Sequence, residues 1–144
     1  MSDTMLRRVL DDWLERVPLR RRLLDFLVQE GIVAYLVGGT VRDALLLRES
    51  CDIDLAVAHG AIALARRLAD YLHGAYVPLD EPRGVGRAVV FAEGGLQHVD
   101  VAALRVPDIE ADLRARDYTV NAMAVLMGPA WGALIDPTGG QQDL

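Results

Sequence analysis

The chain has 144 residues, of which 52% are hydrophobic and 25% are charged, and its formal net charge at pH 7 is −6. This composition excludes a disordered or fibrous protein, and the length is sufficient for one domain with a buried core. The acidic balance argues against a domain that grips nucleic acid by charge alone, because such domains usually carry a basic surplus.

Several simple features indicate where the protein works. Cys51 is the only cysteine, which excludes an intramolecular disulfide and a cysteine-based zinc site. No apolar run approaches the roughly 20 residues that a membrane helix requires. The N-terminal segment is charged and amphipathic and lacks the apolar core of a secretory signal. We therefore expect a cytoplasmic protein that does not engage a membrane.

The first part of the chain alternates between helical and extended patterns. Apolar residues recur at helical spacing over residues 4–16 and 18–30, which predicts two amphipathic helices. A β-branched apolar run predicts a strand over residues 32–37, followed by a short helix over 40–47. A second strand is predicted over residues 52–58.

One basic run in the second predicted helix has two interpretations. Arg20, Arg21 and Arg22 are consecutive. They either form a solvated helix face or contact RNA. We favour the solvated face, because charged runs on amphipathic helices usually meet water.

The remaining elements predict a mixed α/β (α+β) fold with a sheet of about five strands and helices mainly on one face. We divide the chain into an N-terminal helical segment, residues 1–31, and a second unit, residues 32–144. We also expect it to be a fragment of a longer polypeptide. The further predicted elements are a helix over 61–72 closed by Gly74, a strand over 75–79, a loop over 80–86, a hairpin of strands 87–92 and 96–104, a largely helical segment over 108–124 and a small hairpin in the tail.

Two acidic residues stand in the second predicted strand. Asp52 and Asp54 share one face of it, because strand side chains alternate. Two such carboxylates can converge on divalent cations, and Mg²⁺ binds through one or two carboxylates together with substrate phosphates. An exposed strand face also carries this pattern without any function, so the pair alone is weak support for catalysis.

The preceding glycines strengthen the catalytic interpretation. Gly38 and Gly39 lie between a predicted strand and a predicted helix, where backbone N–H groups can approach a phosphate closely. Arg42 adds a full positive charge to the partial charge of the helix N-terminus. The alternative is a tight turn with Arg42 paired to Asp43 at the surface.

A third acid and a basic segment complete the candidate set. Asp100, in the last strand of the predicted hairpin, can point to the same side as Asp52 or simply face solvent. Arg116 is suited to hold phosphate, while Asp117 and Asn121 are four residues apart on one helix face and can bond ribose hydroxyls. The alternative for this segment is a charged helix face without a ligand.

Three segments together resemble one known family. The sequences GGTVRDALLLRESCDIDLAV, RARDYTVNAMAV and IDPTGGQQDL are similar to the head domain of bacterial class II tRNA nucleotidyltransferases and poly(A) polymerases. That family belongs to the DNA polymerase beta nucleotidyltransferase superfamily. The match runs from about residue 33 to the end of the chain, in the family's motif order.

The resemblance implies a metal-dependent enzyme with a polymerase beta-like head. It would transfer a nucleoside monophosphate from CTP or ATP to the 3′-hydroxyl of an RNA, in particular tRNA. The implied roles are binding of two Mg²⁺ ions by Asp52 and Asp54, nucleotide contact by Gly39 and Arg42, phosphate contact by Arg116 and ribose recognition around Asp117 and Asn121. Asp100 corresponds to the family's strand acid, and it would activate the 3′-hydroxyl directly or through a metal.

Departures from the family pattern keep alternatives open. Leu47 stands where the family often has glycine, and Ala115 precedes Arg116 where a second arginine is usual. The neck, body and tail that select the base and hold tRNA in the family do not occur in this sequence. A poly(A) polymerase, or an enzyme that adds only CC or only A, therefore remains an alternative. A nucleotide-binding regulatory module without catalysis is the alternative from another class.

Overall fold

The computed structural model describes residues 2–92, 95–104, 108–114 and 122–143. The helices in these ranges are α1 (Asp3–Arg16), α2 (Pro18–Gln29), α3 (Gly38–Leu45), α4 (Ala61–Tyr71) and α5 (Ile109–Arg114), with short 3-10 turns at η1 (Glu81–Arg83) and η3 (Gly140–Asp143). The strands are β1 (Ala34–Val37), β2 (Asp52–Val57), β3 (Ala75–Asp80), β4 (Val85–Ala92), β5 (Gly95–Ala103), β6 (Ala124–Met127) and β7 (Leu134–Ile135). The two N-terminal helices and β2 agree with their predicted bounds to within one residue at each end.

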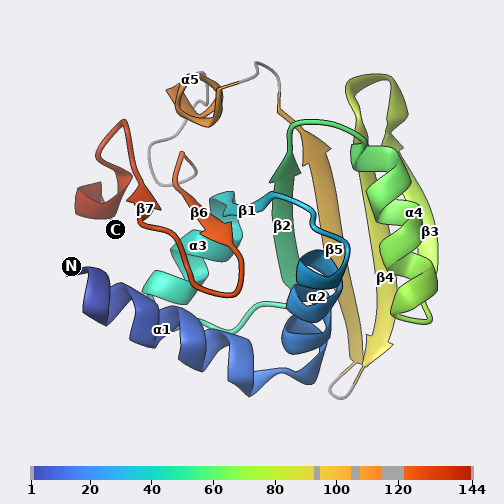
Figure 1. Cartoon of the computed structure of the whole chain (residues 1–144), viewed down its shortest axis with the longest axis horizontal. Coiled ribbons are helices and arrows are strands. Elements are labelled where there is room, and N and C mark those ends of the chain that lie inside the picture. Colours follow the sequence, from blue (N-terminus) through green and yellow to red (C-terminus); the bar gives the residue numbers. More distant parts are fainter. Residues whose placement is uncertain (1, 93–94, 105–107, 115–121, 144) are drawn as a thin grey trace.

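Within the described ranges, seven strands form one sheet in the order β3-β4-β5-β2-β1-β6-β7. The pair β2–β5 is parallel, and the other neighbours are antiparallel. Figure 1 shows β2, β5 and β4 side by side, with α2 in front of the sheet and α1 along its lower edge. The predicted mixed α/β class is confirmed.

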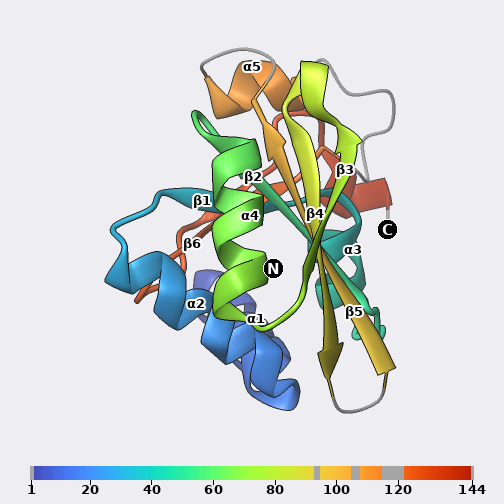
Figure 2. The same ribbon diagram turned by 90° about the vertical axis from the view of Figure 1, so that its right-hand side faces the viewer.

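Helices α1, α2 and α4 lie on one side of the sheet (Figure 2). Alternate strand residues point into this layer, so Ile53 and Leu55 of β2 share a core with Leu68 of α4. A smaller apolar cluster lies on the opposite face, where Leu113 of α5 belongs to the same group as Ala56. The face opposite the main helical layer is therefore covered only in part by apolar packing, and it carries the even-numbered residues of β2.

The sheet is wider than expected because both strands of the predicted tail hairpin join it. β6 pairs with β1, and β7 pairs with β6. The prediction of largely helical structure over residues 108–124 is wrong in part. α5 ends at Arg114 and β6 begins at Ala124, while residues 115–121 lie outside the described ranges.

Helix α3 ends in a Schellman motif without the usual glycine. The Arg48 N–H donates to the Asp43 carbonyl at 2.8 Å, and the Leu47 N–H donates to the Ala44 carbonyl at 3.2 Å. Leu47 has φ 56, a left-handed conformation that costs a non-glycine residue about 1–2 kcal/mol. The leucine at this position therefore leaves the helix end hydrogen-bonded but strained.

Helix α4 ends in the same way, one residue before the predicted glycine. His73 has φ 57 and occupies the left-handed position, while the Gly74 N–H donates to the Ala69 carbonyl at 2.8 Å. A Cβ on Gly74 would lie 2.2 Å from the Val89 carbonyl oxygen of β4. Gly74 is thus required by the close approach of β4, and His73 supplies the conformation that ends the helix.

The arginine run of α2 is divided between the interior and the surface. Arg20 is 1% exposed, its Nη1 donates to the Trp13 carbonyl at 2.7 Å, and its guanidinium lies 4.4 Å from the centroid of the Trp13 ring. Arg21 pairs with Glu15 at the surface, and Arg22 is also exposed. The solvated-face interpretation therefore holds for Arg21 and Arg22 and is wrong for Arg20. None of the helices in the described ranges combines the length and apolar character that a membrane crossing requires.

Candidate active site

The pairing of β1 with β2 brings two predicted site segments together. The strands are antiparallel, so the residues that follow β1 lie beside the start of β2. Gly38, with φ 59, begins α3 directly. A Cβ on Gly39 would lie 3.1 Å from Arg42 Nη2 and 3.6 Å from Asp54 Oδ2. The Arg42 guanidinium and the Asp54 carboxylate therefore converge on the backbone of Gly39.

Thr40 fixes this arrangement, although sequence reasoning missed it. Its buried hydroxyl oxygen accepts a hydrogen bond from the Asp54 N–H at 2.6 Å. This bond joins the first turn of α3 to β2, because it satisfies a strand N–H with a helix side chain. A hydroxyl residue directly after two glycines was the available signal in the sequence.

Arg42 also makes the contact that the alternative interpretation expected. Its Nε donates to Asp43 Oδ1 at 3.2 Å, and the two side chains are 34% and 17% exposed. The same guanidinium places Nη2 near Gly39. The ion pair with Asp43 and an orientation toward the glycines thus occur together.

Asp52 and Asp54 leave β2 on the same face but differ in their surroundings. Asp52 is 52% exposed, and its Oδ1 lies 3.0 Å from His98 Nδ1 on β5. The parallel register pairs these two residues across the strands. His98 was not predicted as a site residue, because it is separated from Asp52 by more than forty positions and no motif marks it.

Asp100 lies on the same face as Asp54, which is one of the two orientations that the sequence left open. The two residues are register partners on β2 and β5. Asp100 does not simply face solvent, because Arg87 of β4 holds it through both oxygens. Arg87 Nε donates to Oδ1 at 2.7 Å and Nη2 donates to Oδ2 at 3.0 Å. Arg87 is a further residue of this region that sequence reasoning missed.

Two adjoining hollows lie at these residues, and they share Val85 and Ala102. The first has a volume of about 380 Å³ and is lined by Val37, Gly38, Gly39, Asp54, Leu55, Val85, Asp100 and Ala102. The second, of about 750 Å³, is lined by Asp80, Arg83, Val85, Ala102, Ala103, Leu104 and Asp112.

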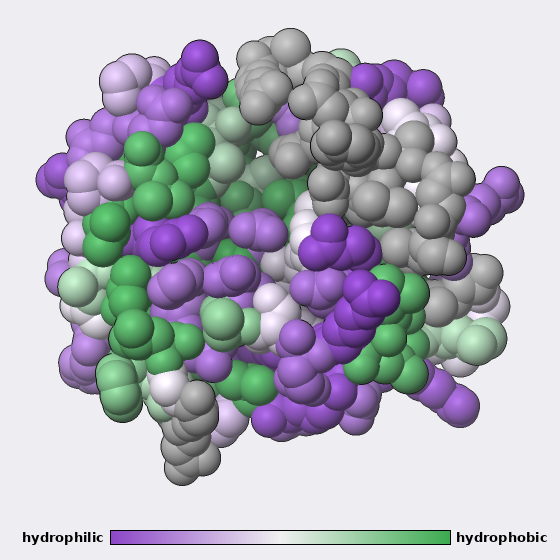
Figure 3. All heavy atoms as spheres, turned by 180° about the vertical axis from the view of Figure 1, so that it is seen from behind, coloured by the Kyte–Doolittle hydropathy of each residue, from purple (hydrophilic) through white to green (hydrophobic). Residues whose placement is uncertain are grey.

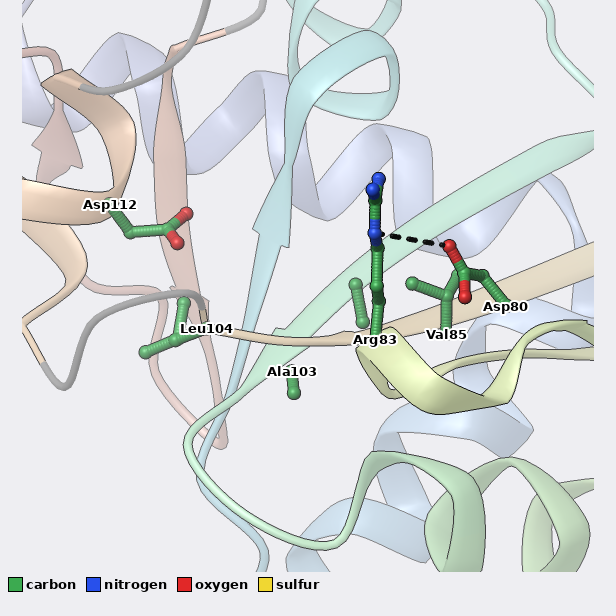
Figure 4. Close-up of a pocket in the computed structure, with 7 residues that line it drawn as sticks. Asp80, Arg83, Val85, Ala103, Leu104 and Asp112 are labelled. Carbon is green, nitrogen blue, oxygen red and sulfur yellow. Dashed lines mark ion pairs between the residues drawn. The ribbon is translucent and has the colours of Figure 1, made fainter.

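Charged side chains stand at opposite sides of the larger hollow. Figure 4 shows the Arg83–Asp80 ion pair on one side and Asp112 of α5 on the other. Seen from behind the view of Figure 1, hydrophilic surface lies between hydrophobic patches on the molecule (Figure 3). The hollows are therefore polar at their edges and suited to a charged ligand.

The predicted phosphate and ribose residues are Arg116, Asp117 and Asn121. All three lie outside the described ranges. Their predicted roles therefore stay predictions.

The donor chemistry of the described residues fits a cation that is shared with a phosphate ligand. In the described ranges, no three His, Cys, Asp or Glu side chains are grouped closely enough to hold a metal ion by themselves. Mg²⁺ usually needs only one or two carboxylates, with substrate phosphates and water completing its shell. Asp52 and Asp54 meet this smaller requirement, since both leave the same face of β2 and Asp54 lies against Gly39.

The sequence profile described as "Poly A polymerase head domain" matches residues 34–108 and 92–144. The chain belongs to this family. The resemblance found from the three sequence segments is thereby confirmed, and the head-domain match covers every predicted site residue.

Curated relatives of this head domain differ in what they add. The CC-adding tRNA nucleotidyltransferase of Geobacter sulfurreducens is 47% identical over 114 residues, which are 79% of this chain and 26% of the relative. The A-adding tRNA nucleotidyltransferase of Deinococcus radiodurans is 50% identical over 111 residues, 77% of this chain and 24% of the relative. The chain thus spans about a quarter of the length of these relatives.

A solved structure shows the same head-domain fold. The CCA-adding enzyme of Thermotoga maritima, in complex with tRNA, superposes with a TM-score of 0.67 at 40% sequence identity. The superposition covers 85% of this chain and 29% of the Thermotoga chain. The architecture described above is therefore shared with part of that enzyme.

Proposed function

We propose that this chain is the catalytic head of a metal-dependent nucleotidyltransferase. It transfers a nucleoside monophosphate from CTP or ATP to the 3′-hydroxyl of an RNA, in particular tRNA, and releases pyrophosphate. Two kinds of support agree: the family membership, and relatives that are named as CC-adding and A-adding tRNA nucleotidyltransferases. We further propose that it works in the cytoplasm, without a membrane partner, which accords with this tRNA-processing family.

One observation carries the proposal. The Arg42 guanidinium and the Asp54 carboxylate both approach the bare backbone of Gly39. The positive charge of Arg42 suits a phosphate, and the negative charge of Asp54 suits a metal ion. Together they match a ligand that contains both a phosphate and a metal ion. The glycine lets the Arg42 guanidinium lie close to the backbone, because a methyl group there would approach Arg42 Nη2 to 3.1 Å.

The roles of the residues follow from their charges. Asp52 and Asp54 would hold Mg²⁺ at a two-metal site, where the metal would supply charge stabilisation to the attacking and leaving oxygens. Gly38, Gly39 and the start of α3 bind phosphate through backbone N–H groups, with Arg42 as a counter-charge. Catalysis then rests on positioning and on charge stabilisation, as is usual for phosphoryl transfer.

Further residues complete the proposed machinery. Asp100 would activate the 3′-hydroxyl, either by accepting its proton or by holding a metal ion that polarises it. Arg116 contacts phosphate, and Asp117 and Asn121 recognise ribose; for these three the family resemblance is the support.

The proposed division of the chain places the transferase unit at residues 32–144 and a helical segment at residues 1–31. The support is the family match, which begins at residue 34. Residues of α1 and α2 also belong to the main core, so the helical segment packs on the transferase unit and does not stand apart from it.

The family match does not decide whether the enzyme adds C, A or both. The CC-adding and A-adding relatives match nearly the same share of this chain at 47% and 50% identity. A poly(A) polymerase is the alternative of the same class. A regulatory module that binds nucleotide without transferring it is the alternative of another class, and the experiment below separates it.

The test is extension of a tRNA that lacks its 3′-terminal nucleotides, with Mg²⁺ and either CTP or ATP. We expect extension by the full-length protein that carries this head domain and none by the same protein with Asp52→Ala, a change that should keep the circular dichroism of the wild type because Asp52 is 52% exposed. Extension by Asp52→Ala at the wild-type rate would show that the assignment is wrong. Nucleotide binding without extension by the wild type would favour the regulatory module.

A further inference from the structure

Arg87 forms an ion pair with Asp100, and the proposed chemistry needs the carboxylate of Asp100. Two parallel N–H···O bonds, of 2.7 and 3.0 Å, join the guanidinium to both carboxylate oxygens. Such forked pairs are stronger and more directional than single contacts. The side chains of Arg87 and Asp100 are only 28% and 22% exposed, so water screens the pair incompletely.

The strand register places this pair in line with the proposed metal ligands. Arg87 lies opposite Asp100 across β4 and β5, and Asp100 lies opposite Asp54 across β5 and β2. The three residues therefore form one row across three adjacent strands. Asp52 stands two positions along β2 on the same face.

Arg87 acts electrostatically on all three carboxylates. Its hydrogen bonds to Asp100 are the main reason that the pKa of Arg87 is raised, while partial burial opposes the increase. The charges of Asp100, Asp52 and Asp54 raise this pKa further. A single guanidinium thus offsets part of the repulsion among three neighbouring aspartates, as a bound divalent cation would.

Arg87 and a divalent cation compete for the same carboxylate. A carboxylate ligand gives an oxygen lone pair to the metal, but both oxygens of Asp100 already accept hydrogen bonds from Arg87. Asp100 can join a metal only when at least one of these bonds is given up. The positive charge of Arg87 also opposes the approach of a cation.

We propose that Arg87 is an internal counter-cation, which holds Asp100 away from the metal and thereby sets the divalent-cation concentration at which Asp100 joins Asp52 and Asp54. The inference rests on the proposed function, since it takes the face of Asp52 and Asp54 as a cation site. Arg87 is a positioning residue in this account, because it acts on the metal through Asp100.

The test measures binding of Mn²⁺ alone to the complete chain, by electron paramagnetic resonance of the free ion. Replacement of Arg87 by Met removes the competing charge and frees both oxygens of Asp100. We expect Arg87→Met to bind Mn²⁺ about fivefold more tightly than the wild type. The matched control is Arg66→Met, which makes the same charge change on α4, where Arg66 lies over the Tyr76 ring; its Mn²⁺ affinity should stay at the wild-type value.

A double-mutant cycle separates two explanations of tighter Mn²⁺ binding: release of the Asp100 carboxylate from Arg87, and the mere loss of one positive charge. If Arg87 acts by holding Asp100, Arg87→Met should tighten Mn²⁺ binding much less in the Asp100→Asn background. An equal gain in both backgrounds would overturn the proposal, as would unchanged or weaker binding by a folded Arg87→Met protein. Should Arg87→Met fail to fold, Arg87→Lys replaces it, with about twofold tighter binding expected because lysine cannot hold both oxygens in a fork.

A different variant shows whether the proposed cation site itself is wrong. If Mn²⁺ binding by the wild type survives in the Asp52→Asn, Asp54→Asn double variant, these residues are not the cation site, and both proposals are overturned. If binding is lost in that variant but Arg87→Met has no effect, the proposed site stands and the role of Arg87 is wrong.

Discussion

Asp54 and Asp100 are paired across the parallel strands β2 and β5, so their carboxylates leave the sheet on the same face. They are 46 positions apart in the chain, and the parallel register makes them neighbours. The same register sets His98 beside Asp52. The acidic face is thus a product of strand pairing and not of any single sequence motif.

The bare backbone at Gly39 should be essential for nucleotide binding. In Gly39→Ala, the new methyl group would lie 3.1 Å from Arg42 Nη2, the mobile end of a flexible side chain. The fold should therefore survive, while affinity for Mg²⁺–CTP falls about tenfold because the phosphate and Arg42 are displaced. Calorimetric titration measures this change.

Gly128→Ala is the matched control for that substitution. A Cβ there would make only an ordinary contact, 3.6 Å from the Ala130 carbonyl oxygen. We expect its nucleotide affinity to equal that of the wild type. Equal affinities for Gly39→Ala and Gly128→Ala would contradict a phosphate site at Gly39.

The end of α3 offers a stabilising substitution. Leu47→Gly should raise the free energy of unfolding by about 1 kcal/mol, because it removes the strain of φ 56 and Leu47 is 62% exposed. Urea unfolding followed by circular dichroism measures the change. Met5→Gly, at an exposed position inside α1, should instead lower the stability by about 1 kcal/mol. A loss of stability in Leu47→Gly would refute the strained helix end.

Arg20 and Arg21 should differ in how much they contribute to stability. Arg20→Ala removes the hydrogen bond to the Trp13 carbonyl and leaves a buried space, so we expect a loss of about 2–4 kcal/mol of unfolding free energy. Arg21→Ala, at the surface, should change it by no more than about 0.5 kcal/mol. Denaturant unfolding of both variants tests this, and similar losses in the two would contradict the inward orientation of Arg20.

The described site should discriminate poorly between bases. Gly39, Arg42 and Asp54 are placed to act on phosphate and metal, which CTP and ATP share. We therefore expect weak binding of both nucleotides by this chain, with dissociation constants within about fivefold of each other. Competition between the two nucleotides in a fluorescence assay measures the ratio. A preference for one base of more than about tenfold would contradict the expectation.

Sequence reasoning succeeded where local pattern decides the structure. The periodicity of the two N-terminal helices and the alternation in β2 are local signals, and both were found with the correct bounds to within a residue. The shared face of Asp52 and Asp54 followed from the same alternation. The pairing of β1 with β2 places the glycine segment beside them.

Several of the misses depend on pairing across the sheet. Arg87 meets Asp100 only because the register of β4 with β5 places the two opposite each other, and no local pattern states that register. The tail strands joined the sheet through β1, which precedes them by about ninety positions. The tail hairpin itself was predicted, but local pattern does not state which strand it pairs with, so its place in the sheet was not.

Mg²⁺-dependent binding of CTP, measured by calorimetry on the wild type and on the Asp52→Asn, Asp54→Asn double variant, tests the central claim most directly. We predict that the wild type binds CTP with Mg²⁺ and loses this binding in excess EDTA. The double variant should stay folded, since it removes two neighbouring negative charges, and should show no Mg²⁺-dependent binding. Unchanged Mg²⁺-dependent binding by the folded double variant would contradict the assignment of Asp52 and Asp54 as the metal ligands of a nucleotidyltransferase.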